Sequence, residues 1–167
     1  MMVFETERLK IRQLNFEDVQ LFHQMQSNPK VMQFADGKLK NFDDNANELK
    51  ELINRYTVVD NDFWIYGIIK KSDNQFIGTV AVVKDANNDD EIGYRFLENY
   101  WGLGYGFEIC KGLISYCQKI GIKKIIAYVV DENKASVKIV EKNNFKILKR
   151  FISHDLQLPE TKYQLKL

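Results

Sequence analysis

Residues 91–121, EIGYRFLENYWGLGYGFEICKGLISYCQKIG, join a strand pattern to a helix pattern through a glycine-rich turn. The segment Glu91–Leu97 is short, aromatic and β-branched in character, and this predicts a strand. From about Tyr105, apolar residues recur at the spacing of one helix face. These residues are Phe107, Cys110, Leu113, Ile114 and Cys117. The stretch therefore predicts a strand, a turn and a helix in direct succession.

The turn, WGLGYG at 101–106, has glycine at every second position. Glycine permits positive φ and lets a ligand approach the main chain. The first N–H groups of the following helix have no intrahelical partner and favour an anion. Because the turn contains no Lys or Arg, a phosphate here would be held mainly by main-chain N–H groups.

Two well-known glycine loops fit this turn poorly. A P-loop ends in Gly-Lys-Ser/Thr, and no such sequence follows Gly106. A dinucleotide-binding fingerprint has the spacing G-x-G-x-x-G after the first strand of a βαβ unit. Here the spacing is G-x-G-x-G, and the loop lies past the middle of the chain. An ordinary glycine-rich turn between a strand and a helix stays open as an alternative.

The turn resembles the Q/R-x-x-G-x-G/A pyrophosphate loop of GNAT-type N-acetyltransferases, which bind acetyl-CoA. Trp101 stands at the Q/R position, Gly104 at the central glycine and Gly106 at the small residue. The string from Gly93 to Gly106 is similar to the branch that acetylates the N-termini of ribosomal proteins, where Trp is common at that place. The opening ETERLKIRQL and the segment NPKVM at 28–32 resemble the same branch.

A second segment, DENKASVKIVEKNNF at 131–145, resembles the family signature E-N-x-x-S-x-x-x-x-E-K-x-G-F. The resemblance implies that Asn133 bonds the pantetheine arm and that Ser136 lies beside the thioester sulfur as a general acid. The residues alone predict Asn133 as a helix N-cap. Asn144 replaces the usual glycine, and asparagine tolerates the left-handed conformation that the turn requires.

Hydrophobic periodicity along the chain predicts an α+β fold with the order β-α-α-β-β-β-α-β-α-β-β. The GNAT family has this order, with a mostly antiparallel sheet splayed around acetyl-CoA. The predicted strands cover 6–14, 63–70, 76–84, 91–97, 124–130, 145–152 and 162–167; the predicted helices follow Asn15, cover 43–56, begin at about 105 and cover 135–143.

Composition indicates a single domain, 1–167, with an ordinary globular balance of apolar and charged residues. The formal net charge of +1 provides no overall field for nucleic acid. The sequence has no long apolar run and no signal pattern, so we expect a cytoplasmic protein without a membrane partner. Cys110 and Cys117 are expected to be buried thiols rather than a disulfide or a metal pair.

Acetyl transfer to an amine needs a held cofactor, a neutral amine, a donor for the oxyanion and a proton for the leaving thiolate. The resemblance implies that pantetheine bonds the main chain of 96–98. Glu91 and Asp155 are candidate bases. Glu91 is equally well explained as a solvated carboxylate, and an Asp in a loop such as Asp155 is more often an ordinary surface residue. The predicted catalytic residues are Ser136, Glu91 and Asp155, and the predicted cofactor-binding residues are Phe96, Leu97, Glu98, Trp101, Gly102, Leu103, Gly104, Tyr105, Gly106, Asn133, Ser136 and Lys142.

These features predict an N-acetyltransferase that uses acetyl-CoA and releases CoA after direct attack in a ternary complex. The expected acceptor is a primary amine, either a protein N-terminus or a small amine. The acidic loop 85–91 could supply a pocket for a cationic acceptor. The alternative function is a non-catalytic acyl-CoA-binding module. A homodimer stays open as a further partner.

Overall fold

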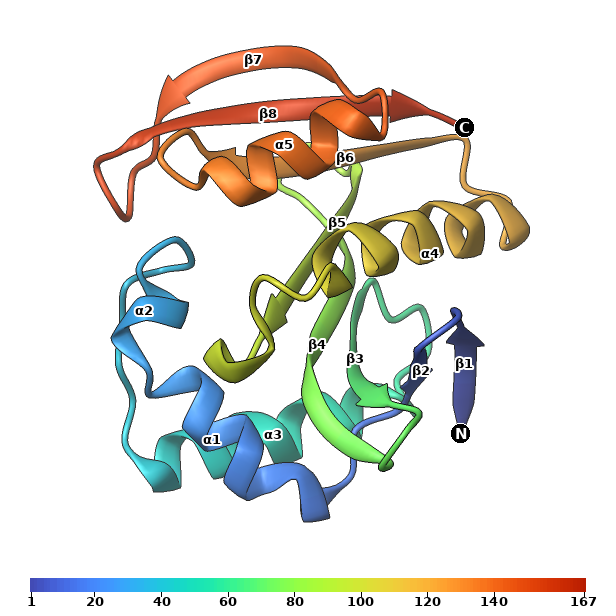
Figure 1. Cartoon of the computed structure of the whole chain (residues 1–167), viewed down its shortest axis with the longest axis vertical. Helices are drawn as coiled ribbons and strands as arrows, with labels where there is room; N and C mark the ends of the chain where they lie inside the picture. The colour runs from blue at the N-terminus through green and yellow to red at the C-terminus, as the bar shows by residue number, and fades with distance from the viewer.

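The computed structural model describes all of residues 1–167, and they form one eight-stranded sheet with helices on both faces (Figure 1). The strand order is β1-β2-β3-β4-β5-β6-β8-β7. The strands are β1 (Met2–Glu5), β2 (Leu9–Arg12), β3 (Phe63–Lys70), β4 (Gln75–Lys84), β5 (Asp90–Phe96), β6 (Lys124–Val130), β7 (Lys146–Ile152) and β8 (Pro159–Lys166). The helices are α1 (Val19–Gln26), α2 (Pro29–Met32), α3 (Phe42–Arg55), α4 (Tyr105–Lys119) and α5 (Lys134–Lys142), with 3-10 turns η1 (Phe16–Asp18) and η2 (Glu98–Tyr100).

The predicted order of elements is confirmed, except that the first predicted strand, 6–14, is shorter and follows an additional strand. Only β2 occupies that range, and β1 pairs with it antiparallel. Thr6 makes the connection, because its N–H donates to the Leu9 carbonyl at 2.9 Å and its hydroxyl accepts from the Leu9 N–H at 3.2 Å. Residues 6–8 of this turn are all polar, and the alternation that predicted the strand begins only at Leu9.

The start of the first helical region is fixed by a capping box. The Asn15 side chain accepts from the Glu17 N–H, and the Asp18 carboxylate accepts from the Asn15 N–H at 3.0 Å. Asp18 also holds Arg12 of β2 in a two-pronged ion pair at 2.8 Å. These bonds place α1 against the sheet, as the Asn15 cap predicts.

Two hydrophobic clusters form the core. One packs α4 and α5 against the sheet and contains Ile109, Leu113 and Cys117, all fully buried. The other packs α1, α2 and α3 against β3 and β4, and contains Phe22 and Leu49. Strand alternation separates the two clusters. Phe107, predicted on the buried face of α4, is instead 38% exposed, because the face that packs runs through Ile109 and Leu113.

Both cysteines of α4 are free and buried, as predicted. Burial raises the pKa of each thiol to about 12, so neither is poised to react as a thiolate. No helix combines the length and the apolar character needed to cross a membrane.

The sheet opens between β5 and β6, which run parallel and share a single register pair, Glu91 with Ile126. By contrast, β4 and β5 pair over seven residues. The sheet therefore divides into β1–β5 and a β6-β8-β7 half, joined at the start of β5 and apart beyond it (Figure 1). This geometry confirms the splayed sheet that the family resemblance implies.

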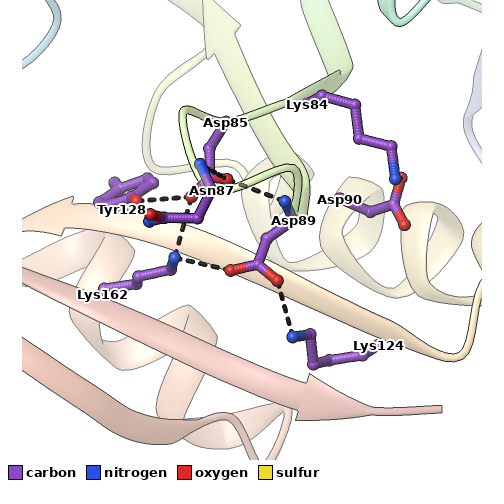
Figure 2. A network of polar contacts seen from close by, with 8 residues as sticks. All are labelled: Lys84, Asp85, Asn87, Asp89, Asp90, Lys124, Tyr128 and Lys162. Atoms are coloured by element: carbon purple, nitrogen blue, oxygen red, sulfur yellow. Dashed lines mark hydrogen bonds and ion pairs between the residues drawn. The ribbon is translucent and has the colours of Figure 1, made fainter.

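A buried ion cluster joins the two halves at the closed end (Figure 2). Lys162 of β8 bonds Asp85 at 2.9 Å and Asp89 at 2.8 Å, both in the loop between β4 and β5. Tyr128 of β6 donates to Asp85 at 2.7 Å, and Lys124 bonds Asp89 at 2.7 Å. The side chains of Lys162 and Asp85 are only 6% and 5% exposed. The carboxylates of the acidic loop are thus paired with lysines within the fold. The prediction that residues 85–91 form an acidic pocket is therefore wrong, except that Glu91 lines a cavity.

We expect Lys162→Met to destabilise the protein by about 3–5 kcal/mol, because it leaves two carboxylates without their buried partner. Although burial opposes ionisation, Lys162 and Tyr128 hold the pKa of Asp85 below its usual range. A carboxylate with a lowered folded-state pKa stabilises the fold above about pH 4 and loses this effect as the pH falls. The difference between wild type and variant should therefore shrink below pH 4 in urea titrations.

The control for this experiment is Lys84→Met. Lys84 pairs with Asp90 at 2.7 Å beside the same loop, but both side chains are about a third exposed. Exposed pairs contribute at most about 1 kcal/mol, so the control should unfold near the wild-type midpoint. Equal losses in both variants would contradict the assigned role of the buried cluster.

Candidate functional site

A cavity of about 860 Å³ lies where β5 separates from β6, and residues from both faces of β5 line it. Tyr94 and Phe96 face α4 and α5, because both side chains pack in the cluster that those helices form. Glu91, Gly93 and Arg95 alternate with them and face α1 and α3. One continuous cavity therefore connects two chemically different sides of a single strand.

The glycine turn forms one end of the cavity. Gly104 is the N-cap of α4 in the left-handed conformation at φ +82°, and Gly102 has φ +73°. No side chain caps the helix, and the first i to i−4 bond runs from the Glu108 N–H to the Gly104 carbonyl. The N–H groups of residues 105–107, all lining the cavity, therefore have no intrahelical partner.

Arg8, at the start of β2, braces this turn, and sequence reasoning did not assign it a role. Its guanidinium donates to the Leu103 carbonyl at 2.9 Å, bonds Glu108 at 2.6 Å and lies 4.3 Å from the centre of the Tyr105 ring. Although burial opposes ionisation, hydrogen bonds from Thr6 and Arg8 hold the pKa of Glu108 below its usual range. The available signal was the arginine in the opening ETERLKIRQL, which resembles the same branch of the family.

The main chain after β5 offers fewer free groups than predicted. The Leu97 N–H donates to Ile77 of β4, its carbonyl accepts from Tyr100, and the Glu98 carbonyl accepts from Trp101. The Leu97 side chain is buried in the core, and neither Leu97 nor Glu98 lines the cavity. The Leu97 N–H and carbonyl are therefore both occupied within the protein, which corrects its assignment as a pantetheine contact, whereas the assignment of the Glu98 main chain stays a prediction.

Phe96 retains one suitable group. A Cβ placed on Gly78 of β4 would meet the Arg95 carbonyl oxygen at 2.1 Å, so this carbonyl points toward β4. Because the C=O and N–H of one trans peptide unit point in opposite directions, the Phe96 N–H points toward the opening. The Phe96 carbonyl accepts from the Trp101 indole N–H at 3.1 Å, which fixes the predicted Trp101 at the rim.

The N-terminus of α5 forms the opposite wall. Asn133 caps the helix through its side-chain oxygen, which accepts from the Ser136 N–H at 3.3 Å, as the local pattern predicts. Ser136 faces Tyr94, whose hydroxyl is buried without a hydrogen-bond partner. Burial raises the pKa of Tyr94, and the neighbouring Ser136 hydroxyl partly opposes this effect. Two protonated hydroxyls therefore meet on the cofactor-facing side of β5.

Glu91 is the carboxyl group of the cavity whose proton affinity is strongly raised. Burial, together with the nearby charges of Asp85 and Glu160, raises the pKa of Glu91 to about 7, against a smaller opposing effect of Lys162. A carboxylate with this pKa can accept a proton at neutral pH. The structure therefore brings Glu91 and Ser136 to the same cavity.

Besides Leu97 and Glu98, three further predicted site residues lie outside the cavity walls. Asp155 is exposed in the loop between β7 and β8, which packs on the link between α2 and α3 through Leu156 and Gly37. Lys142 is exposed at the last turn of α5, the end away from Asn133. Leu103 is exposed and reaches the site only through its carbonyl bond to Arg8. The geometry gives no support to the predicted side-chain roles of Asp155 and Lys142, and the predicted main-chain role of Leu103 stays a prediction.

The chain belongs to the GNAT acetyltransferase family: the model of the acetyltransferase (GNAT) domain matches residues 8–146. It is 30% identical over 145 residues to an uncharacterized N-acetyltransferase, p20, of Bacillus licheniformis, covering 84% of this chain and 80% of that protein.

Two solved structures share the fold. One is the ribosomal-protein alpha-N-acetyltransferase RimL in complex with coenzyme A, with TM-score 0.84, 16% identity and coverage of 100% of this chain and 98% of that one. The other is spermidine N-acetyltransferase from Vibrio cholerae in complex with CoA and spermine, with TM-score 0.79, 18% identity and 95% coverage of each chain. The fold binds CoA in these relatives, and the residues of the cavity fit such a group.

We expect Gly104→Val to abolish CoA binding, because a Cβ at this position would already meet the Arg8 guanidinium at 3.4 Å and a branched side chain would displace the turn that Arg8 holds in place. The matched control is Gly121→Val, since Gly121 has a similar φ of +89° and lies after the other end of α4. Both variants carry the same backbone strain, so only Gly104→Val should lose the calorimetric signal with CoA. Wild-type affinity in Gly104→Val would contradict the assignment of the turn.

Proposed function

We propose that this protein transfers an acetyl group from acetyl-CoA to a primary amine by direct attack in a ternary complex. The observation that carries the proposal is the single cavity that joins the uncapped start of α4 to Glu91 through the opening beside β5. Membership of the GNAT family supports acetyl-CoA as the donor. The acceptor is a protein N-terminus or a small amine, the two classes named for the RimL and spermidine acetyltransferase structures.

The cofactor would lie along the side of β5 that faces α4 and α5. The free N–H groups of residues 105–107 would hold its diphosphate, with Arg8 keeping the turn in place. The Asn133 side-chain NH₂, which donates to no group of the protein, would bond the pantetheine arm. The Phe96 N–H would bond the pantetheine or the developing oxyanion of the thioester carbonyl.

Proton movement would use groups on both sides of β5. Glu91 would take the proton from the acceptor ammonium, directly or through one water, so that a neutral amine attacks. The C–N bond forms as the thioester C–S bond breaks, and the leaving thiolate takes a proton from Ser136. The serine hydroxyl would be restored, through water, by the proton that the attacking nitrogen loses as it becomes an amide. The buried Tyr94 hydroxyl, beside Ser136, would support this donor. The reaction then yields an acetylamide and CoA.

The second candidate function is a non-catalytic acyl-CoA-binding module, which needs the glycine turn but no base. The raised pKa of Glu91 favours catalysis. Cofactor binding alone does not require a carboxyl group that titrates near neutral pH on the side of β5 where the acceptor would lie. Release of free CoA thiol from acetyl-CoA, measured with a panel of amines, decides between the two. CoA binding without amine-dependent release would establish the binding module.

We expect kcat/KM for the amine to rise with pH through about 7, because Glu91 must be ionised to act and its folded-state pKa is raised to about that value. Glu91→Gln should remove this limb and leave only the titration of the acceptor ammonium. The initial rate of thiol release, measured from pH 5 to 9, reports both variants. Asp155→Asn is the control and should keep the wild-type profile; a shift in that variant instead would assign the base to Asp155.

Ser136→Ala should lower kcat by about 100-fold, within the usual range for a general acid, while the CoA dissociation constant changes little. Tyr94→Phe should lower kcat less, since the phenol supports the donor rather than replacing it. Stopped-flow thiol release and calorimetry measure the two quantities separately. Unchanged kcat in Ser136→Ala would remove that residue as the acid.

A further inference from the structure

The side of the cavity that faces α1 and α3, where the acceptor would lie, contains a partly buried positive charge, Arg95, that forms no ion pair with a carboxylate of the protein. Arg95 extends from β5 toward α1, where its Nη1 donates to the Oε1 of Gln26. It takes part in none of the ion pairs of the protein. A guanidinium has five N–H donors, so most of its bonding capacity is available to a ligand.

Neither of the two carboxylates whose charges act on Arg95 contacts it: Asp36 accepts from the Lys38 N–H at 2.9 Å. Glu48 of α3 bonds Lys40 at 2.7 Å and accepts from the Gln26 side chain at 3.1 Å. Gln26 is 5% exposed and therefore holds Arg95 with a neutral amide rather than with a charge. Burial lowers the pKa of Arg95, opposed by Asp36 and Glu48 from a distance. Removing an unpaired charge from most of its water is costly, and a ligand that pairs with Arg95 would offset this cost.

The wall around Arg95 leaves room for that ligand. Thr79 and Ala81 of β4 lie opposite Arg95 and Gly93, so small side chains line this part of the cavity. The position also separates Arg95 from the cofactor. Its neighbours Tyr94 and Phe96 point to the other face of the strand, toward the glycine turn and α5. The charge therefore faces the acceptor rather than the phosphates of CoA.

We propose that Arg95, positioned by Gln26, binds a carboxylate of the acceptor, so that the substrate is a primary amine carrying an acidic group several bonds away. A guanidinium binds a carboxylate through two parallel hydrogen bonds, which also orients the substrate. Glu91 lies four residues from Arg95 on the same face, roughly 13 Å along the strand. This span suits an acidic side chain at the second or third residue of a peptide, or a long ω-amino acid, and exceeds the size of an α-amino acid.

The test compares acceptors that differ only in charge. One pair is the C-terminally amidated peptides Ser-Glu-Ala-Ala and Ser-Gln-Ala-Ala; the other is ε-aminocaproate and its amide. We expect the carboxylate member of at least one pair to have a kcat/KM about tenfold or more above its partner, since bonds to charged groups contribute about 1.5–3 kcal/mol. A preference confined to one pair identifies whether the carboxylate comes from a peptide or a small molecule.

Arg95→Gln should reduce this ratio to about one. Lys30→Gln is the matched control, because Lys30 also lines the cavity but is exposed and paired with Glu98 at 2.8 Å; it should keep the wild-type ratio. The inference rests on the proposed acetyl transfer, and the two fail separately. Absence of thiol release with every amine would overturn the proposed function. Release with equal kcat/KM within both pairs of wild-type reactions would overturn the role of Arg95 alone, whether or not the variant folds.

Discussion

The ion cluster of Lys162, Asp85 and Asp89 is the constraint on which the cavity depends. The halves of the sheet share one register pair between β5 and β6, so main-chain hydrogen bonding does little to hold them together. The ion cluster connects the two halves where β4 ends and β5 begins (Figure 2). Beyond this end, β5 and β6 are not paired. A sheet closed at one end and unpaired at the other opens into a wedge. The cofactor site is therefore a consequence of where the two halves are joined.

Within the wedge, β5 separates the chemistry by strand alternation. Its even-numbered residues, Tyr94 and Phe96, face the helices that begin with free N–H groups or with the Asn133 cap. Its odd-numbered residues, Glu91 and Arg95, face the side covered by α1 and α3. A slip of one residue in the pairing of β4 and β5 would exchange the two sets. The seven-residue register of these strands therefore fixes which charges the acceptor meets.

Local patterns in the sequence predicted most of the fold. β3 and β6 begin and end where periodicity places them, and the Asn15 and Asn133 caps start their helices as expected. What the sequence could not provide was the partner of each polar group. The carboxylates of loop 85–90 suggested an acidic pocket, because nothing local indicates that Lys162 lies against them. Leu97 likewise fitted the family pattern, but its N–H bonds a carbonyl of another strand, which only the register specifies.

The same long-range contacts link stability to proton affinity. Asp85 belongs to the buried cluster, and its charge also helps to raise the pKa of Glu91, while Lys162 acts in the opposite direction. The charges of Asp85 and Lys162 therefore act on Glu91 in opposite directions, and the same two residues also join the halves of the sheet. Exchanging Asp85 for a neutral residue would leave Lys162 less compensated and would lower the pKa of Glu91 away from neutrality. A substitution in the ion cluster that joins the two halves of the sheet therefore also changes the pKa of Glu91, the group best placed to activate the amine.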